Sequence, residues 1–126
     1  MMARVKYTIE FPTRAKPELI YTYISTASGL QAWFADEVNV NGKTYTFIWD
    51  GAGEKAELVS KKINKMTKFK WSERDEDEFV GFEIVRDDLT DDVSLMVTDF
   101  EEEEDVEDAK AVWEVSMDQL KMTIGG

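Results

Sequence analysis

The sequence predicts an α+β fold in which a curved antiparallel sheet of about seven strands wraps around a long C-terminal helix, with two short helices after the first strand. Apolar and polar residues alternate near the N-terminus and again from about residue 36 to residue 100, which is the spacing of half-buried strands. Turn sequences separate these strands. The last part of the chain changes to apolar spacings of three and four, as in an amphipathic helix. The length of 126 residues predicts one domain over residues 1–126.

The first strand and the two short helices are predicted from local spacing. The strand alternates through Val5, Tyr7, Ile9 and Phe11, and Pro12 is expected to end it. Pro17 suits the first turn of a helix. The apolar face of that helix consists of Leu19, Ile20, Tyr23 and Ile24. Ser28–Gly29 is expected to break it, and a second short helix follows with an apolar face of Leu30, Trp33 and Phe34.

Six further strands are predicted in the middle of the chain. Asn41–Gly42 is the strongest short hairpin signal, and further turns are expected at 50–53, 64–65, 75–78 and 87–92. The apolar residues between these turns are Val38 and Val40; Tyr45, Phe47 and Trp49; Leu58 and Val59; Phe69 and Trp71, after Thr67; Val80, Phe82 and Ile84; and Val93, Leu95 and Val97. Short strands joined by tight turns are typical of an antiparallel meander.

The C-terminal segment is predicted to be a helix of about 20 residues, roughly 30 Å long. One face collects Ala109, Val112, Trp113, Ser116, Met117, Leu120, Thr123 and Ile124. Between Asp99 and Asp108 eight of ten residues are acidic. This run favours a helix N-terminus, where the helix dipole attracts negative charge. Glu101, Glu102 and Glu103 are expected to face solvent.

The net charge of −12 is unevenly distributed along the chain. Residues 1–70 carry 11 Lys/Arg and 7 Asp/Glu, a balance of +4, whereas residues 71–126 carry 4 and 20, a balance of −16. The acidic half would repel phosphate backbones, so no nucleic-acid partner is expected. The lysine-rich stretch from Lys55 to Lys70 is interpreted as a solvated strand face.

The chain contains neither histidine nor cysteine. Ser-His-Asp and Cys-His sites, zinc sites with the usual nitrogen and sulfur ligands, and haem ligation by these residues are therefore excluded. We expect no catalytic residues, no metal ligands and no cofactor. No secretory signal opens the sequence and no later segment approaches a membrane span, so we expect a cytoplasmic protein that is not membrane-integral.

Several short segments carry a resemblance to a known family. They are Tyr7–Pro12, Gly29–Phe34, Gly42–Phe47, Lys68–Trp71, and the helical residues Trp113 and Leu120. With the order of elements, they make the chain similar to the START-like (helix-grip, SRPBCC) superfamily. Within it, the chain most resembles bacterial START-like proteins and homologues of the heat-shock-protein ATPase activator. The resemblance implies an apolar cavity between sheet and C-terminal helix that holds lipids, sterols, polyketides or other hydrophobic molecules.

The first functional hypothesis is therefore non-catalytic binding of a hydrophobic small molecule or lipid in this cavity. The candidate ligand-binding residues are Trp33, Tyr45, Phe47, Trp49, Phe69, Trp71, Phe82, Trp113, Ser116 and Met117. Tryptophan can also complete a core, so core packing stays an alternative for the four tryptophans. For Ser116 the alternative is a hydrogen bond from its hydroxyl to a carbonyl of its own helix. The second hypothesis is a co-chaperone-like module that binds a protein partner through the acidic helix start or a sheet edge. A cyclase- or hydrolase-like enzyme is the third, which the missing histidine disfavours.

Overall fold

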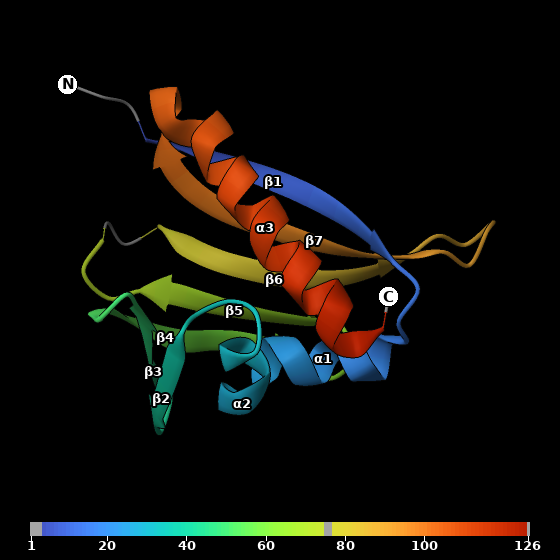
Figure 1. Ribbon diagram of the computed structural model, residues 1–126, viewed down its shortest axis with the longest axis horizontal. Coiled ribbons are helices and arrows are strands. Elements are labelled where there is room, and N and C mark those ends of the chain that lie inside the picture. Colours follow the sequence, from blue (N-terminus) through green and yellow to red (C-terminus); the bar gives the residue numbers. More distant parts are fainter. Residues whose placement is uncertain (1–3, 75–76, 126) are drawn as a thin grey trace.

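In a computed structural model of the protein, which describes residues 4–74 and 77–125, seven strands form one antiparallel sheet in the order β1-β7-β6-β5-β4-β3-β2 (Figure 1). The strands are β1 (Arg4–Thr13), β2 (Glu37–Asn41), β3 (Thr44–Trp49), β4 (Ala52–Lys62), β5 (Met66–Trp71), β6 (Phe79–Arg86) and β7 (Val93–Glu102). The helices are α1 (Pro17–Ser25), α2 (Ala27–Gln31), a 3-10 turn (Glu103–Asp105) and α3 (Val106–Ile124). The predicted α+β class and the long C-terminal helix are confirmed.

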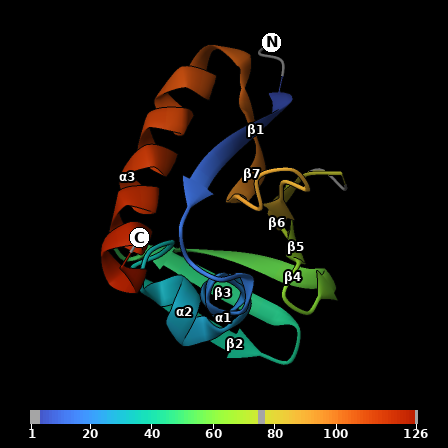
Figure 2. The same ribbon diagram turned by 90° about the vertical axis from the view of Figure 1, so that its right-hand side faces the viewer.

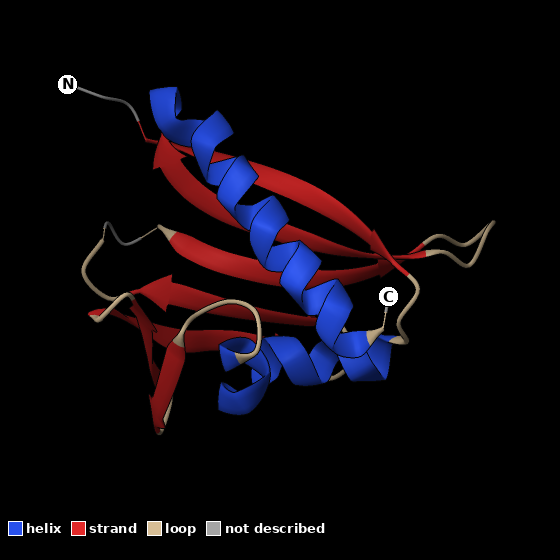
Figure 3. Cartoon of the chain, in the orientation of Figure 1, coloured by secondary structure: helices blue, strands red, loops and turns tan. Residues whose placement is uncertain are grey.

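The sheet curves around α3, which crosses its inner face diagonally (Figures 1 and 2). Figure 3 shows that the two short helices close the lower end of the same layer, beside the β2 side of the sheet. A bulge at Val59 shifts the register of β4 against β5, and an extra residue of this kind bends a strand. The alternation found in the sequence places alternate apolar residues of β3, β5, β6 and β7 on the inner face, whereas Val40 of β2 and Val59 of β4 are exposed.

The first strand continues past the residue that was expected to end it. Pro12 lies inside β1 and pairs with Ser94 of β7. The prediction was wrong because β1 is an edge strand, where a residue without a backbone N–H can be accommodated.

The break between the short helices also differs from the prediction. It falls at Thr26, which has an extended backbone and whose hydroxyl accepts the Gly29 N–H at 3.0 Å. Ser28–Gly29 is inside α2. A side chain at position 29 would place its Cβ 2.2 Å from the carbonyl oxygen of Thr22, so glycine is required here for the close approach of α2 to α1. Trp33 and Phe34 follow α2 rather than belonging to it.

The acidic run is divided between a strand and a helix. Asp99, Glu101 and Glu102 belong to β7, and α3 begins at Val106. The first acids of the run therefore do not belong to the helix N-terminus, whereas the predicted length of about 20 residues agrees with the 19 residues of α3. Because β7 pairs with the full length of β1, its ladder of hydrogen bonds continues through the charged residues. On α3 the predicted face is partly confirmed: Trp113, Met117 and Leu120 are buried, whereas Val112 and Thr123 are exposed.

The lower part of the sheet–helix interface is filled with side chains. Ile20, Ile24 and Leu30 from the short helices pack against the sheet, and each is at most 1% exposed. Three side chains donate hydrogen bonds to the last carbonyl groups of α1: Trp33 Nε1 to Tyr23 at 2.8 Å, Thr67 Oγ1 to Ile24 at 2.9 Å and the Tyr45 hydroxyl to Ser25 at 3.2 Å. These donors satisfy carbonyl groups that a helix end leaves without an intrahelical partner.

Of the lysines predicted to form a solvated face, Lys55, Lys61, Lys62 and Lys65 are exposed, and Lys68 and Lys70 are half-buried. Of the turn expected at 75–78, residues 75 and 76 lie outside the described residues. In the described part of the chain, no helix combines the length and the hydropathy that crossing a bilayer requires.

Candidate ligand pocket

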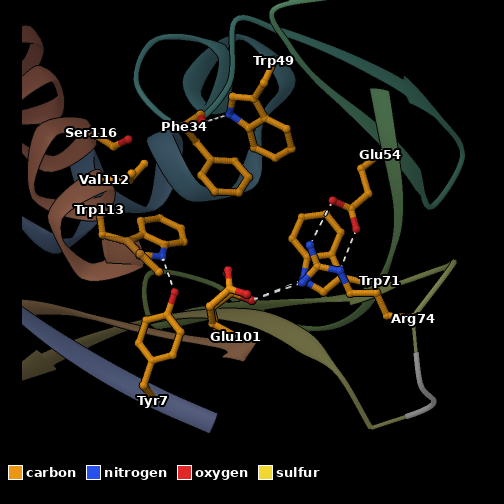
Figure 4. A pocket seen from close by; sticks show the side chains of 12 residues that line it. Tyr7, Phe34, Trp49, Glu54, Trp71, Arg74, Glu101, Val112, Trp113 and Ser116 are labelled. Carbon is orange, nitrogen blue, oxygen red and sulfur yellow. Dashed lines mark hydrogen bonds and ion pairs between the residues drawn. The ribbon is translucent and has the colours of Figure 1, made fainter. Parts of the chain in front are cut away.

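A pocket of about 320 Å³ lies where the first half of α3 stands above the sheet (Figure 4). Small-molecule sites in proteins begin at about 300 Å³, so its size is at the lower end of that range. The sheet contributes side chains from β1, β3, β4, β5 and β7, α3 covers them, and Phe34 and Arg74 come from the connections after α2 and β5. The lining residues are Tyr7, Phe34, Trp49, Glu54, Trp71, Arg74, Asp99, Glu101, Ala109, Val112, Trp113 and Ser116. We refer to them as the aromatic pocket.

Aromatic rings form most of the apolar wall of this pocket. Phe34 stacks on Trp113 with ring centroids 5.3 Å apart, and it meets Trp49 edge-to-face, also at 5.3 Å. Trp71 lies 6.4 Å from Trp49. Figure 4 shows these four rings around a central space, with Glu101 below it. Stacked and edge-to-face pairs, such as those of Phe34, are the favoured arrangements of aromatic side chains, so this part of the wall is well packed before any ligand enters.

Hydrogen bonds fix the orientation of the three pocket indoles. Trp49 Nε1 donates to the carbonyl oxygen of Phe34 at 2.7 Å, which ties the connection after α2 to β3. Trp113 Nε1 donates to the hydroxyl of Tyr7 at 3.0 Å, which ties α3 to β1. Trp71 Nε1 donates to Oδ1 of Asp99 at 3.3 Å.

The other side of the pocket is polar. The Arg74 guanidinium makes a two-pronged contact with Glu54, at 2.7 and 3.0 Å, and lies 4.6 Å from the centroid of the Trp71 ring. Just outside the pocket wall, Arg4 holds the buried carboxylate of Glu78 in the same way, at 2.8 and 2.9 Å. Bidentate arginine–carboxylate pairs are among the stronger polar contacts in proteins, so both arginines have a defined partner.

Asp99 is the most perturbed acid of the pocket. Its side chain is 14% exposed, and burial raises the pKa of this carboxyl to about 6. The N–H groups of Phe100 and Trp71 and the charge of Arg74 favour the ionised form, but they do not offset the loss of water. Burial and the neighbouring Asp99 raise the pKa of the Tyr7 hydroxyl to about 12, so this group stays protonated at neutral pH.

Four of the ten candidate ligand-binding residues line the aromatic pocket, namely Trp49, Trp71, Trp113 and Ser116. Trp33 lies in an adjoining surface depression that shares Phe34, Trp49, Val112 and Ser116 with the pocket. The other five pack in the core away from the pocket wall, and these are Tyr45, Phe47, Phe69, Phe82 and Met117. Phe47 and Phe69 are completely buried, and neighbouring rings occupy the space that a ligand would need there.

The polar lining was missed by the reasoning from sequence. Asp99 and Glu101 were read as part of a charged run before a helix, although they continue the odd-numbered positions of Val93, Leu95 and Val97. Strand alternation carried four residues further would have placed both on the inner face. The expectation that Glu101 faces solvent was wrong, because its side chain is about one-third exposed, lines the pocket and lies 3.8 Å from Arg4. Arg74 and Phe34 lie in connections and had no periodic signal.

Known structures of similar shape span nearly the whole chain. The protein BfR322 from Bacteroides fragilis shares 29% identity and a TM-score of 0.65, over 98% of this chain and 92% of its own. The Aha1 dimer from Colwellia psychrerythraea gives 19% identity and a TM-score of 0.73, over 98% and 96%. Protein MLL2253 from Mesorhizobium loti has 14% identity and a TM-score of 0.75, over 94% of this chain and 95% of its own. At the two lower identities the likeness shows the fold alone. No curated protein has significant sequence similarity to the chain.

A sheet that grips a long C-terminal helix above a small aromatic pocket is the architecture of a helix-grip domain. The model of the START-like superfamily domain matches residues 1–126, and the chain belongs to that superfamily. Domains of this superfamily typically bind hydrophobic ligands, and most are not catalysts, although some members such as polyketide cyclases are enzymes.

Proposed function

We propose that the protein binds a hydrophobic small molecule in the aromatic pocket, without catalysing a reaction on it. The observation that carries this proposal is the pocket itself: a space of about 320 Å³ remains between the first half of α3 and the sheet, and packed rings line it. Val112 supports it, because this pocket residue leaves 66% of its surface exposed on the side of α3 that borders the pocket. Burying such apolar surface under a ligand contributes about 25 cal/mol per Å².

The shape of the pocket limits what can bind. Core side chains fill the space between the C-terminal half of α3 and the sheet. A ligand would therefore occupy the region near Phe34, Trp71 and Trp113 and project towards solvent. A single ring system or a short branched chain fits this volume better than a whole lipid. The ligand would therefore be a compact molecule, or the end of a longer one.

The alternative function is a protein-interaction module that acts through an acidic helix start or a sheet edge, and the helix start gives it less support than the sequence suggested. The acids expected to lie together are divided, with Asp99 and Glu101 turned into the pocket and Glu103 and Glu104 exposed in the turn before α3. The charged surface at the helix start is thus smaller than the sequence suggested.

Titration with the neutral fluorescent probe N-phenyl-1-naphthylamine tests the proposal. We expect a dissociation constant in the micromolar range and a change in tryptophan emission, because three indoles line the pocket. Ser116→Phe, which adds a ring at the pocket wall, should weaken binding at least tenfold. Val115→Phe is the matched control, since it adds the same ring one residue away on the solvent side of α3, where Val115 is 71% exposed. Equal binding by both variants, or no binding to the unsubstituted protein, would contradict the proposal.

A further inference from the structure

The aromatic pocket has more negative charge than its arginine can neutralise. Among the described lining residues three are carboxylates, Glu54, Asp99 and Glu101, and one is a cation, Arg74. The short contacts of Arg74, at 2.7 and 3.0 Å, both go to Glu54, whereas Asp99 lies at 4.0 Å.

The nearby Arg4 does not neutralise the remaining negative charge of the pocket. Its short contacts, at 2.8 and 2.9 Å, go to Glu78, and Glu101 lies 3.8 Å away. Asp99 and Glu101 therefore border the open space with long contacts to cations. The other groups that face Asp99 are the neutral Tyr7 hydroxyl and the indole of Trp71, and the α3 residues that line the pocket carry no charge.

The aromatic part of the wall also favours a positively charged ligand. The faces of Trp and Phe rings attract cations through their quadrupole, most strongly where water is excluded. Phe34, Trp49, Trp71 and Trp113 surround the space that the two carboxylates border. Arg74, at 4.6 Å from the Trp71 ring, already uses this attraction within the chain. A ligand carboxylate would meet two acids of its own sign, whereas an ammonium group would meet opposite charge and ring faces together.

We infer that the ligand of the aromatic pocket is an organic cation, an amine or ammonium group attached to an apolar body, with Asp99 and Glu101 taking the charge and the indole and phenyl rings taking the body. This inference rests on the proposed function, because it requires that the pocket binds a small molecule. It adds the charge of the ligand and the residues that select for it. Asp99 would be a binding residue whose buried charge is compensated when the pocket is filled.

Three probes with one ring system and different head groups test the inference: 1-naphthylmethylamine, 1-naphthylmethanol and 1-naphthoate. Isothermal titration calorimetry at pH 8 should give the amine at least tenfold tighter binding than the alcohol, and the carboxylate the weakest binding. Asp99→Asn should remove most of the preference for the amine and leave the affinity for the alcohol unchanged. Glu101→Gln should reduce the preference for the amine by a smaller factor.

Glu103→Gln is the matched control, because it removes one charge from the same acidic run at an exposed position outside the pocket. It should leave the preference for the amine unchanged. Equal affinities for amine and alcohol would overturn the inference and leave the proposed function standing. A preference that survives Asp99→Asn but falls in Glu103→Gln would also overturn it, since the whole acidic protein would then be attracting the cation. If none of the three probes binds, and N-phenyl-1-naphthylamine does not bind either, the proposed function fails.

Discussion

Replacing Asp99 by Asn should stabilise the fold at neutral and alkaline pH. The folded protein holds the pKa of this carboxyl at about 6, against 3.8 for an unperturbed aspartate, mainly because the side chain is buried. A raised pKa means that the folded state binds the proton more tightly than the unfolded state does. The stability contributed by the protonated form is therefore present below pH 4 and is lost as the pH rises to about 6. Above pH 6 the carboxyl is ionised in the folded protein, and its buried charge lowers the free energy of unfolding by the full amount.

The size of the effect follows from the shift in pKa. Each unit of pKa corresponds to about 1.4 kcal/mol, so the shift from 3.8 to about 6 corresponds to roughly 3 kcal/mol. The asparagine side chain of the variant would be neutral at every pH and would keep an oxygen that can accept the Trp71 N–H. We therefore expect Asp99→Asn to raise the free energy of unfolding by up to about 3 kcal/mol at pH 8. The attraction to Arg74, at 4.0 Å, is already included in this value, because it lowers the pKa that burial alone would give.

Urea denaturation of the two proteins between pH 4 and pH 8, followed by tryptophan fluorescence, measures the difference directly. The stability difference should be near zero at pH 4, grow up to about pH 6 and then stay constant. Asp87→Asn is the control: this exposed carboxylate accepts N–H groups of Leu89 and Thr90 at 2.8 and 3.1 Å, which lowers its pKa, so its neutralisation should lower stability at neutral pH. A loss of stability in Asp99→Asn at pH 8, or a difference independent of pH, would refute the reasoning.

Three further substitutions test the packing. Gly29→Ala should cost about 3 kcal/mol in urea melts, because its Cβ would lie 2.2 Å from the Thr22 carbonyl, whereas Gly53→Ala, with 3.4 Å to its nearest neighbour, should have little effect. Thr67→Val removes the hydroxyl from a fully buried site and should cost about 1–3 kcal/mol, since a buried carbonyl loses its donor; an unchanged urea midpoint would mean that the carbonyl finds another donor. Trp113→Ala should cost about 3–5 kcal/mol and also abolish binding of N-phenyl-1-naphthylamine. Wild-type stability in this last variant would show that the ring does not hold α3 on the sheet.

The burial pattern of the sheet was determined by the sequence alone. The positions that alternate in β5 and β6 are those that point inwards, because a strand turns successive side chains to opposite faces whatever surrounds it. The turn at Asp50–Gly51 was also predictable from the sequence. Both residues adopt positive φ, which aspartate tolerates and glycine adopts freely. The C-terminal helix follows from apolar spacing, which is also local.

Tertiary structure decided which of the inward-facing residues reach the pocket. Phe47 and Trp49 are two residues apart on the same face of β3, yet Phe47 is completely buried in the core and Trp49 lines the pocket. The difference depends on where α3 crosses the sheet, and that position is set by contacts between residues far apart in the chain, such as Trp113 and Tyr7. Alternation in a strand predicts the face of a side chain but not what lies above it.

The charge of the site was also decided in three dimensions. In the sequence Asp99 is one acid of a run, and its neighbours suggest a solvated helix start. Pairing of β7 with β1 places it opposite Tyr7, beneath α3, where it loses most of its water. The pKa of a carboxyl depends on the solvent and charges around it in space, which come here from β1, β5 and the connection that carries Arg74. The sequence by itself therefore determined the order of the strands and helices, whereas the folded chain determined several of their ends and which acid is buried beside which rings.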